Sequence, residues 1–202
     1  MKQLTTLAGL LALLTMPATA SASTRWFSER QPIAEGETVR VPVHGNVTVT
    51  LKPAGQQGIK IPCTASGREA FWNTPQGGKD ETRSLSFACS SAPCGAAAIT
   101  PHLPWSSTLE ESAIDRWDGV ALGVTCGGTN YGTFTGSVQA KVGDVDPEAA
   151  ASEGGIDDLD NFVKFRGGIQ GALVGANGAL AWFTGGYRLG GSGWGISDAP
   201  TG

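Results

Sequence analysis

The sequence predicts an all-β protein: a single-domain antiparallel β-sandwich, or a barrel-like sandwich, stapled by disulfides. Three observations support this fold class. Valine, leucine and isoleucine alternate with polar residues over several segments, which is the period of a half-buried strand. The chain has 30 glycines and only 16% charged residues, a composition typical of β proteins with many turns. Its four cysteines, an even number, suit a disulfide framework.

The first 22 residues have the features of a secretory signal peptide. Lys2 gives a basic start, an apolar run follows from Leu4 to Met16, and small residues close the segment at Ala20 and Ala22. The run is shorter than the roughly 20 apolar residues that span a membrane. We therefore expect 1–22 to be removed and the mature chain to be secreted and extracellular, or periplasmic if the host is Gram-negative.

The mature chain is expected to contain an N-terminal segment over 23–36, a β-sandwich domain over 37–190 and a flexible Gly-rich tail over 191–202. In the domain, alternation over 36–51 indicates two strands, and Gly45-Asn46 between them suits a tight hairpin turn. Further strands are expected, separated by turn-forming residues, over 58–66, 82–88 and 96–103.

The second half of the domain begins with two alternatives. Ser107 and Glu110 match a capping box, which would start a short helix. The regular alternation from Val120 to Cys126 instead favours a hairpin that runs out over 105–109 and returns over 114–126. After an expected strand over 131–142 comes a long acidic connection, followed by closing strands over 161–166, 179–184 and 185–188.

In an exported chain the four cysteines are expected to form two disulfides, with three possible pairings. Cys89 and Cys94 are separated by a four-residue turn, while Cys63 and Cys126 each end an alternating strand on its apolar face. We therefore predict the bonds Cys63–Cys126 and Cys89–Cys94. A zinc site is the alternative, but the spacing contains no C-x-x-C pair.

Charge and motifs limit the function. The formal net charge is −4, which disfavours nucleic acid and anionic membrane surfaces as partners. No second apolar run reaches membrane length. The two histidines, His44 and His102, lie outside any nucleophile motif, and no G-x-S-x-G occurs. We predict no catalytic residue.

Three groups of residues are candidate sites. Trp72, Trp105 and Trp117 could bind a ligand, because exposed aromatic rings can stack on sugar faces. The carboxylates between Glu110 and Asp118 could serve acid hydrolysis. Hard oxygen ligands for Ca²⁺ occur close together at Asp157, Asp158 and Asp160, and no other cofactor is indicated.

The chain also resembles a group of uncharacterised secreted proteins of actinobacteria. The resemblance rests on ordered pieces of sequence: a strand ending in Cys63, the loop 73–78, Cys89 followed by Pro93-Cys94, Leu103-Pro104-Trp105, Cys126-Gly127-Gly128, and 134–137. The usual loop has Asn and Pro adjacent, and here Thr74 intervenes. The resemblance implies a bacterial source, export and a β-rich fold, and it brings no activity with it.

Together these observations favour a secreted, non-enzymatic β-sandwich protein with an unknown extracellular ligand or surface as its partner. Two alternatives stay open. One is a carbohydrate-binding module that uses exposed tryptophans, and the other is a secreted hydrolase that uses acidic residues.

Overall fold

The fold is given by a computed structural model, which describes residues 24–29, 31–91, 94–110, 113–142, 157–158, 162–165, 171–191 and 194–197. The predicted signal peptide, Asp160 and most of the acidic connection lie outside the described residues. Within the described part, no helix is both long and apolar enough to cross a membrane.

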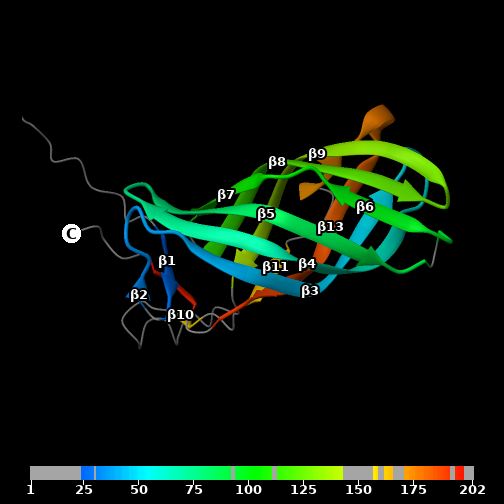
Figure 1. The fold of residues 1–202 in the computed structure, drawn as a ribbon. Coiled ribbons are helices and arrows are strands. Elements are labelled where there is room, and N and C mark those ends of the chain that lie inside the picture. The colour runs from blue at the N-terminus through cyan, green and yellow to red at the C-terminus, as the bar shows by residue number, and fades with distance from the viewer. Residues whose placement is uncertain are drawn as a thin grey trace, which may run out of the picture.

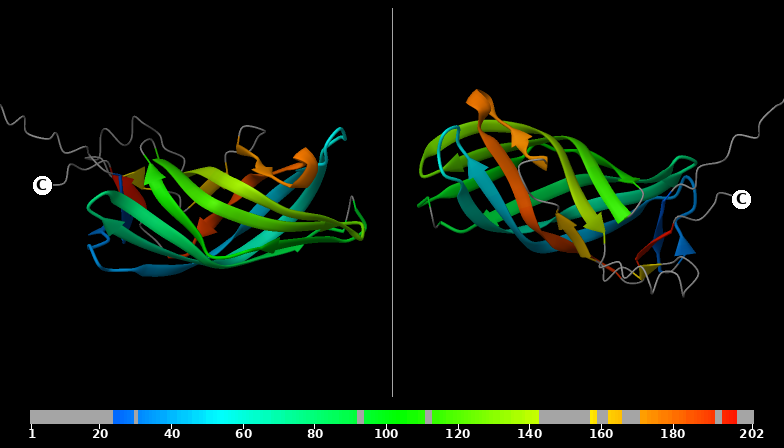
Figure 2. Two further views of the ribbon diagram at one scale, coloured as in Figure 1. Left: turned by 90° about the horizontal axis from the view of Figure 1, so that it is seen from above. Right: turned by 180° about the vertical axis from the view of Figure 1, so that it is seen from behind.

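Over the residues that the structure describes, the main sheet has ten strands and closes into an antiparallel barrel, which confirms the predicted fold class (Figures 1 and 2). Its long strands are β3 (Val39–Lys52), β4 (Ile59–Thr74), β5 (Gly77–Cys89), β8 (Ile114–Cys126), β9 (Thr129–Val142) and β13 (Leu180–Leu189). Its short strands are β6 (Ala97–Pro101), β7 (Trp105–Glu110), β11 (Phe162–Phe165) and β12 (Leu173–Val174).

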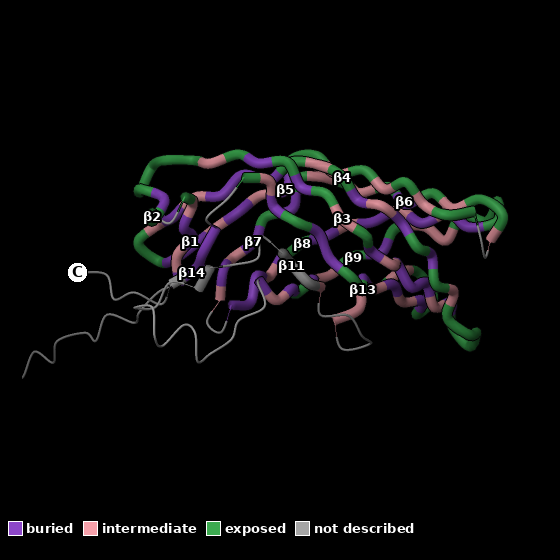
Figure 3. The backbone as a smooth tube through the Cα atoms, turned by 90° about the horizontal axis from the view of Figure 1, so that it is seen from below, coloured by how far each residue is buried: buried purple, intermediate pink, exposed green. Residues whose placement is uncertain are grey.

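Neighbouring strands follow the order β11-β9-β12-β13-β3-β4-β5-β7-β8-β6. Pairing of β8 with β9 closes the barrel, and the short strand β11 pairs with both β9 and β13. The core lies inside, where buried side chains alternate with exposed ones along each strand (Figure 3). Residues with no more than 1% of their surface exposed include Val49, Ile61, Leu122, Phe134 and Leu173.

A smaller sheet lies at one end of the barrel (Figure 1). It has the order β10 (Asp157–Asp158), β14 (Gly195–Ser197), β1 (Arg25–Ser28), β2 (Gln31–Pro32). The amide of Asn73 on β4 fastens it: the oxygen accepts from Trp26 N at 2.8 Å, and the nitrogen donates to Trp26 O at 2.9 Å and Ile33 O at 2.8 Å. Each of these bonds satisfies a buried backbone or side-chain group.

The predicted flexible tail over 191–202 is wrong for 194–197. These residues form β14 and its flank, and both Trp194 and Ile196 are buried. Trp194 packs on Phe71, with ring centroids 4.8 Å apart, and on Trp26, at 6.4 Å. Burial of these apolar side chains against the barrel end outweighs the conformational freedom of the surrounding glycines.

The predicted hairpin turn at 44–46 is also wrong, because β3 runs straight through it. Gly45 is required there for close approach and not for a turn: a Cβ at this position would lie 2.3 Å from Gly186 O and from Tyr187 Cα. Gly67 on the adjacent strand is similar, since its Cβ would lie 2.0 Å from Ser84 O. Glycines at such positions let the strands of a small barrel bend.

The hairpin predicted over 105–109 and 114–126 is confirmed as β7 and β8, and Ser107 and Glu110 belong to β7 and not to a helix. Elsewhere the observed strands are longer than the predicted ones. β4 continues to Thr74, so the expected loop 73–78 shrinks to a turn between β4 and β5.

Two β-bulges change which side chains face the interior. Between the pairs Arg68–Ser84 and Glu69–Thr82, β5 has one residue more than β4. A second register shift, between Trp117 and Val120, adds one residue to β8 relative to β9. A one-residue shift moves every following side chain to the other face. The parts of β5 and β8 that follow the bulges therefore alternate in opposite phase to the parts that precede them.

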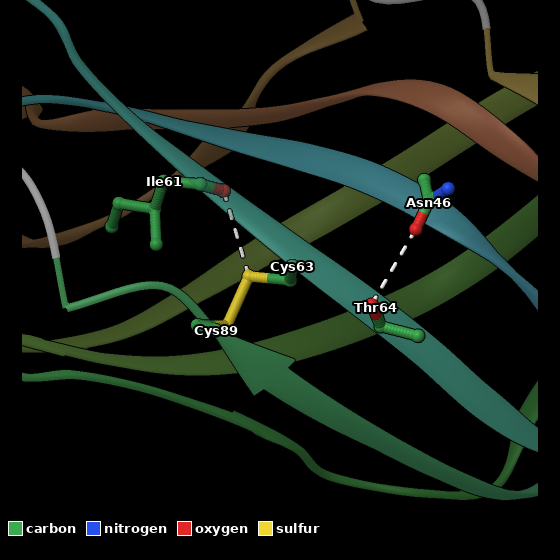
Figure 4. The surroundings of a disulfide bond; sticks show 5 residues. All are labelled: Asn46, Ile61, Cys63, Thr64 and Cys89. Carbon is green, nitrogen blue, oxygen red and sulfur yellow. Dashed lines mark hydrogen bonds between the residues drawn. A yellow bond between two sulfur atoms is a disulfide. The ribbon is translucent and has the colours of Figure 1, made fainter.

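The predicted disulfide pairing is wrong, although all four cysteines are consumed. Cys63 bonds to Cys89, which lies directly opposite on the neighbouring strand with Cα atoms 3.9 Å apart (Figure 4). Cys94 bonds to Cys126, with Cα atoms 5.3 Å apart. The pairing follows from the topology: β4 and β5 form a hairpin that ends at Cys63 and Cys89, and Ala97, three residues after Cys94, pairs with Cys126.

We expect the double variant Cys63→Ser/Cys89→Ser to have no free thiol, and its midpoint of thermal unfolding to fall by roughly 5–15 °C. Closing a loop of this length stabilises a protein by about 2–4 kcal/mol, and each kcal/mol moves the midpoint by about 2–4 °C at this size. Thiol titration under denaturant and calorimetry measure the two quantities. The control Cys63→Ser/Cys126→Ser should expose two thiols; the reverse pattern would restore the pairing predicted from the sequence.

Candidate functional site: the barrel interior

The barrel interior contains a cavity of about 20 Å³, measured as the space open to the centre of a water molecule. This is room for about one water molecule, so a larger molecule enters only if the lining side chains move apart. Three lining side chains are polar: Glu69, Thr82 and Tyr187. The others that line it are aliphatic or aromatic: Val47, Ala65, Leu85, Phe87, Trp105, Trp117, Val120, Val138, Phe165 and Phe183. An apolar cavity with a few convergent polar groups is the usual form of a small-molecule site.

Six aromatic rings surround this space and pack on one another. Phe165 is central, with ring centroids 5.2 Å from Phe183, 5.6 Å from Tyr187 and 6.0 Å from Trp117. Phe183 also contacts Phe87 and Trp105, at 6.1 and 6.5 Å. Strands β5, β7, β8, β11 and β13 supply the six rings, so barrel closure itself assembles the aromatic wall.

The polar side of the cavity is built around Glu69, whose side chain is 3% exposed. Its Oε1 accepts hydrogen bonds from the Tyr187 hydroxyl, at 2.6 Å, and from Thr82 Oγ1, at 3.0 Å. Its Oε2 is buried and has no hydrogen-bond partner among the described residues. Thr82 faces Glu69 in register across β4 and β5, whereas Tyr187 reaches it from β13.

The pKa of Glu69 is raised to about 8. Burial is the largest cause, because it penalises the charged form, and the nearby Asp80 adds to the shift. The hydrogen bonds from Tyr187 and Thr82 act in the opposite direction but are outweighed. Glu69 is therefore mainly protonated at neutral pH.

A second layer of carboxyls lies next to Glu69. Asp80 and Asp115 are fully buried, and Ser107, which faces Asp80 in register, donates its hydroxyl to Asp80 Oδ2. Burial raises the pKa of Asp80, and the charge of Asp115 raises it further. Burial also raises the pKa of Asp115, to about 7. Oδ1 of each carboxyl is buried and has no hydrogen-bond partner among the described residues.

The carboxyl groups of the interior have no basic side chain beside them among the described lining residues. Glu69, Asp80 and Asp115 come together from three strands, and the part of the cavity lining that the structure describes contains no Lys, Arg or His. Buried ionisable groups rarely stabilise a fold more than well-packed apolar residues would. A buried cluster with raised pKa values at a cavity is instead characteristic of functional sites.

The structure places the sequence-predicted tryptophans in two different environments. Trp105 and Trp117 line the cavity and are only 6% and 3% exposed. Trp72 is half-buried on β4 and does not line the cavity. An exposed stacking platform that includes Trp105 and Trp117 is therefore wrong, because both rings are enclosed by the barrel.

The acidic residues near the β7–β8 turn, which the sequence offers as candidates for acid hydrolysis, do not lie together. Glu110 and Asp118 are partly exposed and pair with Arg116, at 3.5 and 3.1 Å, while Asp115 belongs to the interior cluster. Both histidines are exposed. Asp157 and Asp158 form β10, paired with β14. Within the described residues no group of three or more His, Cys, Asp or Glu is arranged to hold a metal ion. The Ca²⁺ site stays a prediction.

Sequence reasoning missed most of the site, although signals for three of its members are present. Glu69 continues the alternation of Ile59, Ile61 and Cys63 along β4, so an extended strand would have placed it inside. Tyr187 continues the alternation of Ala181 and Phe183 in the same way. Ser107 alternates with Trp105 and Leu109 along β7, whereas Asp80 and Thr82 carry no comparable signal.

A closed barrel with an acidic, aromatic-lined interior is thus the class that the fold and the site define. Comparison with protein-family models, with curated proteins and with solved structures gave no match to this chain. The resemblance to secreted actinobacterial proteins accordingly stays a prediction.

Proposed function

We propose that the protein is an exported binding protein that takes a small, mainly apolar molecule into the barrel interior. The observation that carries this proposal is the cavity: ten apolar or aromatic side chains surround a space where Glu69 presents one unpartnered carboxyl oxygen. Small-molecule sites combine apolar walls with a few fixed polar groups in this way. The two disulfides support the export part, because such bonds persist in oxidising compartments.

The position of the tryptophans supports an interior ligand over a sugar bound on the surface. Rings that stack on sugars must be accessible, and Trp105 and Trp117 are instead directed into the cavity. Interior rings also provide a measurement, because a molecule that enters the cavity contacts two tryptophans and should change their fluorescence.

We expect benzyl alcohol to bind in the interior and to change the tryptophan fluorescence of the protein, with a dissociation constant in the millimolar range or tighter. Ala65→Leu should weaken binding by at least about tenfold, because the added methyl groups occupy the cavity that Ala65 lines. Ala88→Leu is the matched control, since Ala88 is exposed on β5. Equal affinities in the two variants, or no binding up to the solubility limit, would refute the proposal.

A second candidate function is an acid-dependent enzyme, which the raised pKa values of the three buried carboxyls Glu69, Asp80 and Asp115 favour. Carboxyls that keep a proton near neutral pH can act as general acids. A binding protein releases its ligand chemically unchanged, whereas an enzyme converts it. Mass spectrometry of molecules recovered after incubation with the protein separates the two.

A further inference from the structure

Building on the proposed function, we infer that the ligand is an organic ammonium ion, with its N–H group bound by the unpartnered oxygen of Glu69 and its carbon skeleton held by the aromatic rings. This goes beyond an interior site for an apolar molecule, because it assigns the ligand a positive charge. It rests on three features of the cavity: a free acceptor, a ring of aromatic faces, and the absence of a lining cation.

The acceptor is the first feature. Glu69 Oε2 is buried, lacks a hydrogen-bond partner among the described residues, and belongs to a side chain that lines the cavity. When Glu69 is ionised, this oxygen is a buried acceptor without a donor, which is energetically unfavourable, and a ligand N–H group would satisfy it. Glu69 Oε1, in contrast, already accepts from Tyr187 and Thr82, so the carboxyl is held in one orientation.

The charge distribution is the second feature. Asp80 and Asp115 lie beside Glu69, and ionisation of any of the three carboxyls makes the interior negative. Among the described residues, no lining side chain is a cation that could neutralise it. A carboxylate or phosphate ligand would face repulsion in this position, whereas an ammonium ion would supply the missing counter-charge.

The aromatic wall is the third feature. Six aromatic side chains line the same small space: Phe87, Phe165, Phe183, Trp105, Trp117 and Tyr187. The faces of aromatic rings carry partial negative charge and attract ammonium groups, most strongly when water is excluded. A carboxylate surrounded by aromatic rings is therefore complementary to an organic ammonium ion, both to its charge and to its carbon skeleton.

If the ligand is an ammonium ion, its affinity should depend on pH, because binding displaces the proton of Glu69. The groups that face Glu69 are Asp80 on β5, Asp115 on β8 and Tyr187 on β13, and burial together with Asp80 keeps Glu69 protonated near neutral pH. An ammonium ion binds the ionised form, so each binding event must displace one proton from Glu69. Its dissociation constant should fall about tenfold per pH unit from pH 5.5 to 7.5 and level off above the pKa of about 8.

The test compares benzylamine with benzyl alcohol, two molecules of the same skeleton that differ in charge. Tryptophan fluorescence or NMR titrations on the mature protein at several pH values give both dissociation constants. We expect benzylamine to bind at least about tenfold more tightly than benzyl alcohol at pH 7.5, and only benzylamine to show the pH dependence. Equal, pH-independent binding of the two would overturn the ammonium inference and leave the interior binding site standing.

Two variants locate the effect. Glu69→Gln should remove both the preference for benzylamine and its pH dependence while benzyl alcohol still binds, whereas Glu37→Gln, at an exposed position before β3, should change neither. Tyr187→Phe removes a hydrogen bond that lowers the pKa of Glu69, so the levelling-off should move to higher pH. A benzylamine preference that survives in Glu69→Gln would place the charge recognition elsewhere and refute the inference. Failure of both molecules to bind would refute the proposed function itself.

Discussion

The protein should become less stable as the pH rises from 5 to 8, by about 3 kcal/mol from Glu69 alone. The cause is the raised pKa of about 8, which means that the folded protein keeps the Glu69 proton at pH values where the unfolded chain has lost it. Below about pH 4 both states bind the proton and the stabilisation is complete. It declines as the pH rises through the window between the two pKa values and is lost above the folded pKa. Asp115, with a pKa raised to about 7, adds a loss of the same sign.

Chemical denaturation at a series of pH values measures this slope, and the midpoint of thermal unfolding should fall by roughly 10 °C over the same range. Glu69→Gln should flatten the slope and be more stable than the wild type at pH 8, because an amide has no proton to lose. Glu37→Gln serves as the control, because Glu37 is exposed and the chemical change is the same. Stability that stays constant or rises between pH 5 and 8 would contradict the raised pKa of the interior carboxyls.

Gly67→Ala should destabilise the barrel by about 3 kcal/mol or more, or prevent folding. The new Cβ would lie 2.0 Å from Ser84 O and 2.9 Å from Ser84 C, so two backbones, and not a flexible side chain, would have to separate. This contact lies beside the bulge in β5 that brings Asp80 and Thr82 to the interior. Opening the strands there should therefore also disturb the hydrogen bond from Thr82 to Glu69.

Urea unfolding of the variant, compared with Gly58→Ala, tests this expectation. At Gly58 the closest atom to a new Cβ is Thr50 Cγ2, at 3.4 Å, so the substitution should be neutral or slightly stabilising. Equal stability of the two variants would show that close approach at Gly67 does not determine the shape of the barrel.

The fold class followed from the sequence because alternation reports which strand faces are buried, whatever their partners. Val39 to Val43, Val47 to Leu51 and Val120 to Cys126 all lie in strands. Alternation does not report where a strand ends. Gly45-Asn46 has the chemistry of a hairpin turn, and only the approach of Tyr187 on β13, far away in the sequence, explains why the strand continues.

The candidate site was harder to predict because bulges reverse the alternation of buried and exposed residues in two of its strands. Extending the alternation of Leu85 and Phe87 backward through β5 would place Glu81 inside and Asp80 outside, and the bulge reverses this. The alternation of Val120 to Cys126 would likewise put Asp115 outside. Bulges depend on how two strands pair, so they leave no mark in the sequence of either strand alone. The disulfide pairing failed for a related reason, since it requires knowing which strands are neighbours.

The pairing of β1 with β14 determines how the protein would respond to a mechanical load. Arg25 lies opposite Ser197, so the chain enters β1 and leaves β14 at the same end of this antiparallel pair. Tension applied through the two ends would break these backbone hydrogen bonds one after another, as in a zipper, and not all at once in shear. If the molecule is tethered at one end and pulled at the other, the small sheet peels away first, and the barrel with its carboxyl cluster is the last part to feel the force.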